Sequence, residues 1–437
     1  PSEMCIRDRV CPYYLGQELA RWCDLAVGDY NYYFDLGAML HGLAQVNQWR
    51  VAVLVDEAHN LVERGRRMYS AELDQGDFLG VRKTAPEALR KPLERIQRAW
   101  NELAKTQADD YQAYDEPPQK LLLALQNAVA AINDLLAEQP QALEPALQEF
   151  YFAILQFGRL AELFGEHSLF DIEKRPGRNG RSLARLCLRN VVPAAFLAER
   201  FAASRSTVLF SATLGPRDYY ADLLGLPAGT PWLEVDSPFS AEQLEVHIQR
   251  RVSTRYAQRQ ASLAPIAAIL GEQFRQRPGN YLAFFSSFDY LQQALDVFRQ
   301  AYPWVPCWSQ TPRMDEAERR VFLERFVTGG EGIGFAVLGG AFGEGIDLPG
   351  ERLIGAFIAT LGLPQVNPVN EQIRLRMQRL FGDGYDYTYL YPGLQKVVQA
   401  AGRVIRSRSD RGVVHLIDDR FAQAKVRRLL PGWWQLR

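Results

Sequence analysis

This sequence has few cysteines, a net charge close to zero and no long apolar runs. Five of its 437 residues are cysteine, an odd number without disulfide-like spacing, which indicates a reducing compartment. The 50 basic and 51 acidic side chains leave a net charge of −1, so any affinity for nucleic acid must come from local patches. No apolar run approaches the roughly 18 residues that cross a bilayer, and no signal peptide is visible. We therefore expect a cytoplasmic protein with no membrane partner.

Three of the five cysteines, Cys5, Cys11 and Cys23, lie in the opening stretch PSEMCIRDRVCPYYLGQELARWC. The first nine residues, PSEMCIRDR, resemble the translated end of a sequencing-library adapter, so residues 1–9 are excluded from fold reasoning. The well-patterned sequence begins near Val10, already inside a domain. We therefore expect the chain to be a fragment of a longer protein.

Strand-like and helical segments alternate in two parts of the chain. The apolar run Val51–Val55 fits a strand buried on both faces of a parallel sheet, and STVLFSATL from Ser206 fits a second strand of that sheet. After the turn-rich SPFSAEQ, strand-like runs begin at Asn280, Gly332 and Gly412 and alternate with helical segments. This alternation predicts a second α/β domain with a parallel sheet.

The segment between the two strands of the first sheet has helical character. It is rich in Leu, Ala, Glu and Gln at helical spacing, which predicts a helical insertion. Its basic, glycine-rich loop KRPGRNGRSLAR is a candidate phosphate contact through Arg175, Arg178, Arg181 and Arg185, or else a solvated loop. The predicted organisation is residues 10–70 and 184–234 for the first domain, 71–183 for the insertion and 235–437 for the second domain.

VLVDEAHN places chemically capable residues on the loop after a buried strand, where α/β folds put their active sites. Asp56 can hold Mg²⁺ through water, and Glu57 can orient and deprotonate a water that attacks a phosphoryl group. The alternative is an acidic helix N-terminus, with His59 a satisfied surface residue.

QAAGRVIRSRSDRG places Arg403 and Arg406 three residues apart, hence on one face of a helix if the segment is helical. Two guanidiniums could then reach one polyphosphate, and Gln399 could help to sense it. A solvated basic face is the alternative. The loop GGAFGEGIDLPG from Gly339 permits close backbone approach to a ligand, but it also fits an ordinary turn.

Taken together and in order, five motifs resemble motifs II, III, IV, V and VI of superfamily 2 helicases: DEAH at Asp56, SATL at Ser211, YLAFFSS at Tyr281, GGAFGEGID at Gly339 and QAAGRVIR at Gln399. Four further marks are similar to the XPD/DinG-like iron–sulfur helicases within that superfamily: CPYY at Cys11, GDYNYYFD at Gly28, DSPF at Asp236 and the EGID form of motif V.

The resemblance implies an α/β fold with two RecA-like parallel-sheet motor domains that clamp ATP between them, the first one truncated, and an Arch-like helical insertion. It implies a monomeric, ATP-dependent helicase that moves 5′ to 3′ along single-stranded DNA and acts on forked or duplex DNA in repair or replication. The catalytic residues it implies are Asp56 (also Mg²⁺ through water), Glu57, His59, Gln399, Arg403 and Arg406. The nucleotide-coupling residues are Glu344, Gly345, Asp347 and Gly402, and the DNA-coupling residues are Ser211, Thr213 and Ser286.

In that family, CPYY carries the last of four cysteines that hold a [4Fe–4S] cluster, so the resemblance makes Cys11 a cluster ligand. The other three ligands are not present. Cys23 lies in an amphipathic stretch and is expected to be a buried small hydrophobe, and Cys187 and Cys307 are expected to be structural.

The sequence contains no GxxxxGK[ST] phosphate loop, whose backbone amides and lysine hold the β- and γ-phosphates of ATP. We therefore expect the carboxyl-terminal portion of a helicase, which as written does not hydrolyse ATP. The competing hypothesis is a non-catalytic single-strand-binding or scaffold protein with a degenerate motor fold.

Overall fold

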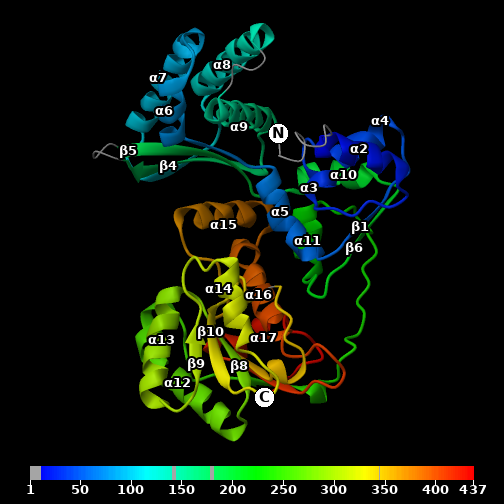
Figure 1. Ribbon diagram of the computed structural model, residues 1–437, viewed down its shortest axis with the longest axis vertical. Coiled ribbons are helices and arrows are strands. Elements are labelled where there is room, and N and C mark those ends of the chain that lie inside the picture. Colours follow the sequence, from blue (N-terminus) through cyan, green and yellow to red (C-terminus); the bar gives the residue numbers. More distant parts are fainter. Residues whose placement is uncertain (1–10, 140–143, 178–181, 344) are drawn as a thin grey trace. The chain divides into compact units, whose positions relative to one another are not determined.

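A computed structural model describes residues 11–139, 144–177, 182–343 and 345–437 of the chain (Figure 1). The chain divides into two compact units, residues 1–230 and 231–437. The division between Thr230 and Pro231 lies a few residues before the predicted boundary between Glu234 and Val235.

The second unit is built on a seven-stranded sheet in which every pair of neighbouring strands is parallel (Figure 1). The strand order is β13-β7-β12-β11-β8-β10-β9. The strands are β7 (Leu244–Ile248), β8 (Asn280–Phe285), β9 (Cys307–Ser309), β10 (Gly332–Val337), β11 (Gly355–Ala359), β12 (Gly412–Leu416) and β13 (Gln435–Leu436). The predicted second parallel sheet is therefore confirmed, with β7, β9, β11 and β13 in addition to the three expected strands.

Two hydrophobic cores lie on opposite faces of this sheet because successive strand side chains alternate in direction. Within β8, Leu282 and Phe284 belong to one core, while Tyr281, Ala283 and Phe285 belong to the other. The first core includes side chains of α14 (Glu316–Glu324), α16 (Tyr391–Ala401) and α17 (Ala424–Arg427). The second includes those of α12 (Arg259–Gln276) and α13 (Phe288–Ala301). The long α15 (Pro368–Phe381) completes the helices of this unit.

The first unit contains the expected parallel pair, β1 (Ala52–Val55) and β6 (Ser206–Leu209). Burial on both faces was the wrong expectation, since Leu54 is 67% and Val208 50% exposed. Leu54 and Val208 are register partners and therefore lie on the same face of this two-stranded sheet, a face that the described residues leave open. The helices of this region are α2 (Pro12–Trp22), α3 (Asn31–Phe34), α4 (Met39–Val46), α5 (Leu61–Met68), α10 (Ala194–Ala203) and α11 (Arg217–Leu224).

The insertion holds four long helices and also an antiparallel sheet that the sequence did not predict. The helices are α6 (Gln75–Thr84), α7 (Arg90–Thr106), α8 (Gln119–Glu138) and α9 (Pro145–Glu162). The sheet has the order β2-β5-β4-β3, with β2 (Ala71–Asp74), β3 (Tyr111–Tyr114), β4 (Ser168–Pro176) and β5 (Ser182–Asn190). The stretch predicted as a basic loop is therefore mostly the paired ends of β4 and β5, and the insertion's sheet extends to Asn190.

One helix of the insertion is as long and apolar as a membrane-spanning helix, so the expectation that no apolar run approaches that length was wrong. By length and composition alone, α8 is long and apolar enough to cross a membrane. It is nevertheless amphipathic in this fold, because Leu121, Leu125 and Ile132 are buried while Leu123 is exposed on another side. Core helices of water-soluble proteins meet the same length and composition criteria.

Candidate functional site

The carboxyl ends of β1 and β6 bring the DEAH and SATL sequences together. The backbone continues the strand pairing beyond the sheet, because the Phe210 N–H donates to Val55 O and the Ala58 N–H donates to Phe210 O, each at 3.0 Å. This pairing sets Glu57 and Ser211 opposite each other although 154 residues separate them. The hydroxyl of Ser211 donates to Glu57 Oε2 at 3.4 Å.

His59 joins these two side chains into one hydrogen-bonded group. Its Nδ1 lies 2.7 Å from Ser211 Oγ and 3.2 Å from Glu57 Oε2. The His59 side chain is 5% exposed, whereas the Glu57 side chain is 61% exposed. The alternative that His59 is a surface residue is therefore wrong. The group consists of a buried imidazole that links a solvent-facing carboxylate to the end of the neighbouring strand.

The carboxylate of Asp56 lies at the start of the same loop. One of its oxygens accepts the Glu57 N–H at 2.7 Å, and the residue is exposed. Thr213 is tied to the group through its backbone, since its N–H donates to Ser211 Oγ at 3.1 Å. The structure thus brings together Asp56, Glu57, His59, Ser211 and Thr213, five residues that the sequence assigned to catalysis or DNA coupling.

Tyr30 is a residue of this site that sequence reasoning missed. Its hydroxyl donates to the backbone oxygens of Asp56 and Glu57, the second at 2.9 Å. Burial, together with the nearby Asp56 and Glu57 carboxylates, raises the pKa of Tyr30 to about 12. Glu57 has φ 47°, a left-handed conformation that non-glycine residues seldom adopt, and the Tyr30 contact helps to hold it. The only sequence signal for Tyr30 was its place in GDYNYYFD.

In the second unit, two predicted arginines converge on the EGID sequence. Arg406 Nε donates to Asp347 Oδ1 at 3.0 Å, and Arg403 Nη1 donates to the Ile346 carbonyl at 3.2 Å. Gly345 has φ 77°, a backbone conformation that favours glycine. The four residues Gly345, Asp347, Arg403 and Arg406 therefore belong to one site of this unit.

The expected helical arrangement of Arg403 and Arg406 is not observed. Helix α16 ends at Ala401, so both arginines follow the helix in a turn. Asp410 shapes this turn, because its Oδ2 accepts the N–H groups of Arg406 and Ser407, each at 2.8 Å. Although burial opposes the charged form of Asp410, hydrogen bonds from the Ser407 hydroxyl and from these backbone groups lower its pKa. Asp410 was also missed by sequence reasoning.

The structure places the other described residues predicted in the second unit in or directly after α16 and β8. Gln399 is half-buried in the last turn of α16, and Gly402 directly follows the helix. Ser286 follows β8, and its hydroxyl accepts a hydrogen bond from Arg259 Nη2 at 2.9 Å. The prediction for Glu344 lies outside the described residues.

The basic stretch of the insertion is partly neutralised by its own carboxylates. Arg175 Nη2 lies 2.7 Å from Glu173 Oε2, and Arg185 Nε lies 3.5 Å from Asp74 Oδ2. The positions of Arg178 and Arg181 lie outside the described residues. These pairs make Arg175 and Arg185 less available to phosphates than an open loop would.

The four cysteines that the structure describes differ in their surroundings. Cys11 and Cys23 are exposed, Cys187 is buried in β5, and Cys307 is half-buried in β9. The expectation that Cys23 is buried is wrong, because it follows the mostly exposed α2, next to Trp22 at 85% exposure. Among the residues that the structure describes, no group of three or more His, Cys, Asp or Glu side chains is arranged to hold a metal. These residues alone therefore do not fit a four-thiolate [4Fe–4S] site.

Two family models match the chain. Residues 270–437 match the Helicase C-terminal domain, and residues 2–78 match DEAD_2. The second match includes part of residues 1–9, so the assignment of that stretch to an adapter stays a prediction.

Curated relatives and solved structures agree with these matches. An ATP-dependent DNA helicase chl-1 from Caenorhabditis elegans is 29% identical over 266 residues, which cover 55% of this chain and 31% of the relative. An ATP-dependent helicase DinG from Mycobacterium tuberculosis is 28% identical over 255 residues, covering 55% of this chain and 37% of the relative. The chain thus spans about a third of the length of these relatives. A solved XPD helicase has TM-score 0.63 and 18% identity over 97% of this chain and 74% of that one, which shows a shared fold.

Proposed function

This chain belongs to the XPD/DinG-like helicases of superfamily 2, and from that premise we propose that its gene product is an ATP-dependent helicase that translocates 5′ to 3′ along single-stranded DNA. We propose forked or duplex DNA as the substrate, in repair or replication. The observation that carries the proposal is the hydrogen-bonded group of Glu57, His59 and Ser211 at the carboxyl ends of two parallel strands.

The proposed roles follow from the chemistry of each side chain. Glu57, with an exposed side chain, would accept a proton from the water that attacks the γ-phosphate. The exposed carboxylate of Asp56 would hold Mg²⁺ through water, and the metal would neutralise charge on the phosphates. His59 transmits a change at Glu57 to Ser211, because it contacts both. A shift of the nucleotide can thereby reach the SATL segment, which is proposed to respond to DNA.

In the second unit, the proposed function of Arg403 and Arg406 is to stabilise charge on the transferring phosphoryl group. The Arg406 side chain is 39% exposed, and its Nε donates to Asp347. The two Nη atoms of its guanidinium therefore remain available to an anion. Gln399 and Gly402 belong to the same proposed group, as does Glu344.

The cofactors proposed are ATP, Mg²⁺ and, for the complete gene product, a [4Fe–4S] cluster with Cys11 as one ligand. The sequence contains no GxxxxGK[ST] motif, so we expect the 437-residue chain alone not to hydrolyse ATP. We also propose a monomer in the cytoplasm.

The test is ATP hydrolysis by the complete gene product with and without single-stranded DNA. We expect Glu57→Gln to lower DNA-stimulated kcat by about 10²-fold or more, since amide replaces the proton acceptor while retaining its shape. Binding of ATP and DNA should change little. Glu149→Gln, at an exposed position of α9, is the matched control and should leave kcat unchanged.

Two results would contradict the proposal in different ways. A Glu57→Gln protein with wild-type hydrolysis would remove Glu57 from the catalytic role. A wild-type gene product that binds single-stranded DNA but never hydrolyses ATP would favour the competing hypothesis of a non-catalytic single-strand-binding or scaffold protein.

A further inference from the structure

The loop between β7 and α12 lies at the carboxyl edge of the seven-stranded sheet. Together with Arg259, the first residue of α12, it has the sequence QRRVSTRYAQR from residue 249 to 259, which contains four arginines. No acidic residue occurs between Glu245 and Glu272. Because β7, β12, β11 and β8 are parallel neighbours, the loops that follow these strands meet at one edge of the sheet. We call residues 249–259 the arginine loop.

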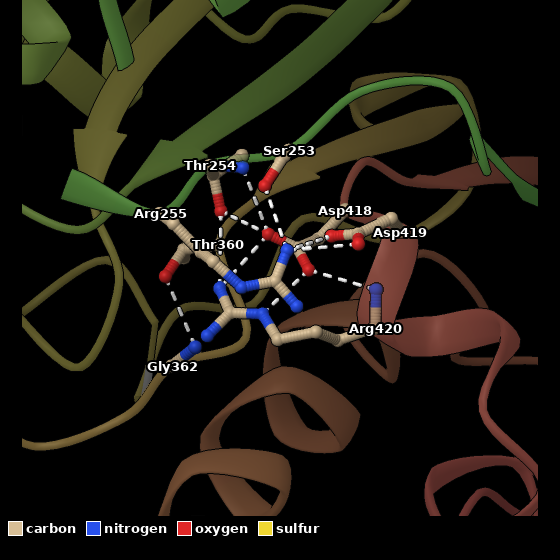
Figure 2. Close-up of polar contacts among 8 residues, drawn as sticks. All are labelled: Ser253, Thr254, Arg255, Thr360, Gly362, Asp418, Asp419 and Arg420. Carbon is tan, nitrogen blue, oxygen red and sulfur yellow. Dashed lines mark hydrogen bonds and ion pairs between the residues drawn. The ribbon is translucent and has the colours of Figure 1, made fainter. Parts of the chain in front are cut away.

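A buried polar network holds the middle of the arginine loop in place (Figure 2). Asp418, which is fully buried, accepts hydrogen bonds from the Thr254 hydroxyl and from the Thr254 N–H, the latter at 2.9 Å. Arg420 closes the network, with Nε donating to Asp418 Oδ1 at 2.6 Å. These contacts join residues 164 positions apart in the sequence, so the loop's conformation is fixed by the segment after β12.

Two further contacts secure the loop on either side of Thr254. The Asp419 N–H donates to the Val252 carbonyl at 2.7 Å. Arg255 Nη1 donates to both oxygens of Asp419, at 2.7 and 2.8 Å (Figure 2). The loop is therefore preorganised, which lowers the entropy lost when it binds a ligand.

The arginine loop presents an aromatic ring to solvent. Tyr256 is 86% exposed. The guanidinium carbon of Arg259 lies 5.2 Å from the centroid of the Tyr256 ring and 5.1 Å from that of the buried Tyr290 ring. Arg259 Nη2 also donates to Ser286 Oγ, at the end of β8. A cation thus contacts one exposed and one buried ring, which steadies Tyr256 and leaves most of its surface open.

The positive charge of the loop is only partly neutralised. Within the described residues, Arg255 is the member of the loop that forms an ion pair, and no carboxylate lies within ion-pair distance of Arg250, Arg251 or Arg259. Arg250 and Arg251 are exposed. An exposed aromatic ring beside unneutralised arginines has the two features that bind single-stranded nucleic acid: a stacking surface for bases and cations for the phosphates.

We propose that the arginine loop is a contact site for single-stranded DNA, in which a base stacks on Tyr256 and the neighbouring arginines bind the phosphate backbone. Single strands are favoured over duplex because their base faces are accessible for stacking. This inference rests on the proposed function, and it adds Tyr256 and Arg259 to the residues assigned to DNA there.

The test measures binding of the 437-residue chain to a fluorescein-labelled oligodeoxythymidylate of about 16 nucleotides by fluorescence anisotropy. We expect Tyr256→Ala to raise Kd about tenfold, because a base–aromatic stack is lost. Tyr256→Phe retains the stack and should stay within about twofold of wild type. Arg259→Ala should reduce the salt dependence of log Kd by about one phosphate contact. The matched control is Trp304→Ala. It removes an exposed aromatic side chain just before β9, which is the last strand at the end of the sheet farther from β7.

A second measurement does not depend on any substitution. An oligonucleotide with 5-iododeoxyuridine at successive positions is irradiated with the wild-type chain, and the adducts are mapped by mass spectrometry. We expect an adduct on Tyr256. Because Tyr256 is exposed, its variants should also keep the wild-type thermal transition, which separates a lost contact from a lost fold.

Each outcome bears on one of the two proposals. If the wild-type chain binds the oligonucleotide but Tyr256→Ala binds equally well and no adduct forms on Tyr256, the loop inference is overturned while the proposed function stands. If Tyr256→Ala weakens duplex and single-stranded DNA equally, base stacking is overturned. If the wild-type chain binds no single-stranded DNA even at low salt, the loop inference is overturned, while the proposed function is decided separately by DNA-stimulated ATP hydrolysis of the complete gene product.

Discussion

At the residue scale, the buried carboxylate of Asp418 is the group from which we expect a measurable contribution to stability. It is fully buried, accepts hydrogen bonds from Thr254 and Arg420, and carries the charge opposite Arg420. Asp418→Asn removes this charge and leaves the Arg420 guanidinium, 16% exposed, without its ionic partner. We expect a loss of about 3 kcal/mol in the free energy of unfolding of the second unit, measured by urea denaturation.

The neighbouring Asp419 supplies the control for this prediction. Its ion pair with Arg255 joins side chains that are 38% and 42% exposed, so Asp419→Asn should cost less than about 1 kcal/mol. Equal stabilities of the two variants would show that the buried pair contributes no more than the exposed one.

The same residue predicts an acid dependence with a definite sign. Burial opposes ionisation of Asp418, but the hydrogen bonds from Arg420 and Thr254 outweigh it and lower its pKa to about 2. A carboxyl whose pKa is lower in the folded state stabilises that state above its ordinary pKa, and the contribution is lost as pH falls from about 4 towards 2. Asp418→Asn should therefore flatten this part of the stability profile, whereas Asp419→Asn should retain it.

At the element scale, the packing of β11 between β8 and β12 leaves no room for one extra carbon. A Cβ added to Gly355 would lie 2.6 Å from the ring of Tyr281 and 2.8 Å from the Val413 carbonyl oxygen. Both neighbours belong to adjacent strands, so they cannot move without disturbing the sheet. We expect Gly355→Ala to destabilise the second unit by about 1–3 kcal/mol in urea denaturation.

A glycine with open surroundings provides the comparison. A Cβ on Gly432 would meet no atom within 4 Å, so Gly432→Ala should change the stability by less than about 0.5 kcal/mol. If Gly355→Ala were equally mild, the strand would be able to shift and β11 would be less tightly packed than these distances indicate.

At the scale of the whole molecule, the two units differ in how completely their sheets are covered. The second unit has seven strands and a hydrophobic core on each face, all supplied by residues after Pro231. We expect residues 231–437, expressed alone, to unfold cooperatively in calorimetry. The midpoint should lie within about 4 °C of the corresponding transition in the 437-residue chain, the shift that ~1 kcal/mol produces in a domain of this size.

A shorter fragment tests the reason for that prediction. Residues 231–409 lack β12, which lies between β7 and β11, so the sheet is interrupted and no cooperative transition is expected. An unfolded 231–437 fragment would show instead that the second unit depends on the first for its stability.

The sequence by itself determined the order of the chemical motifs and the type of the main elements. Runs such as Val51–Val55 and Asn280–Phe285 predict strands because their apolar residues are continuous, and DEAH follows its strand within the same short stretch. These features depend on residues close together in the chain. The positions of Glu57 and Asp56 at a strand end could therefore be predicted correctly.

The tertiary structure decided which distant residues meet. Strand pairing placed Ser211 against His59, the turn capped by Asp410 directed Arg406 to Asp347, and Asp418 fixed a loop 164 residues away at Thr254. None of these contacts has a periodic or local signature, because each depends on strand order and on the path of a loop. The physical reason is that hydrophobic periodicity specifies which face of an element is buried, while the choice of partner for a polar side chain is made only when the elements pack.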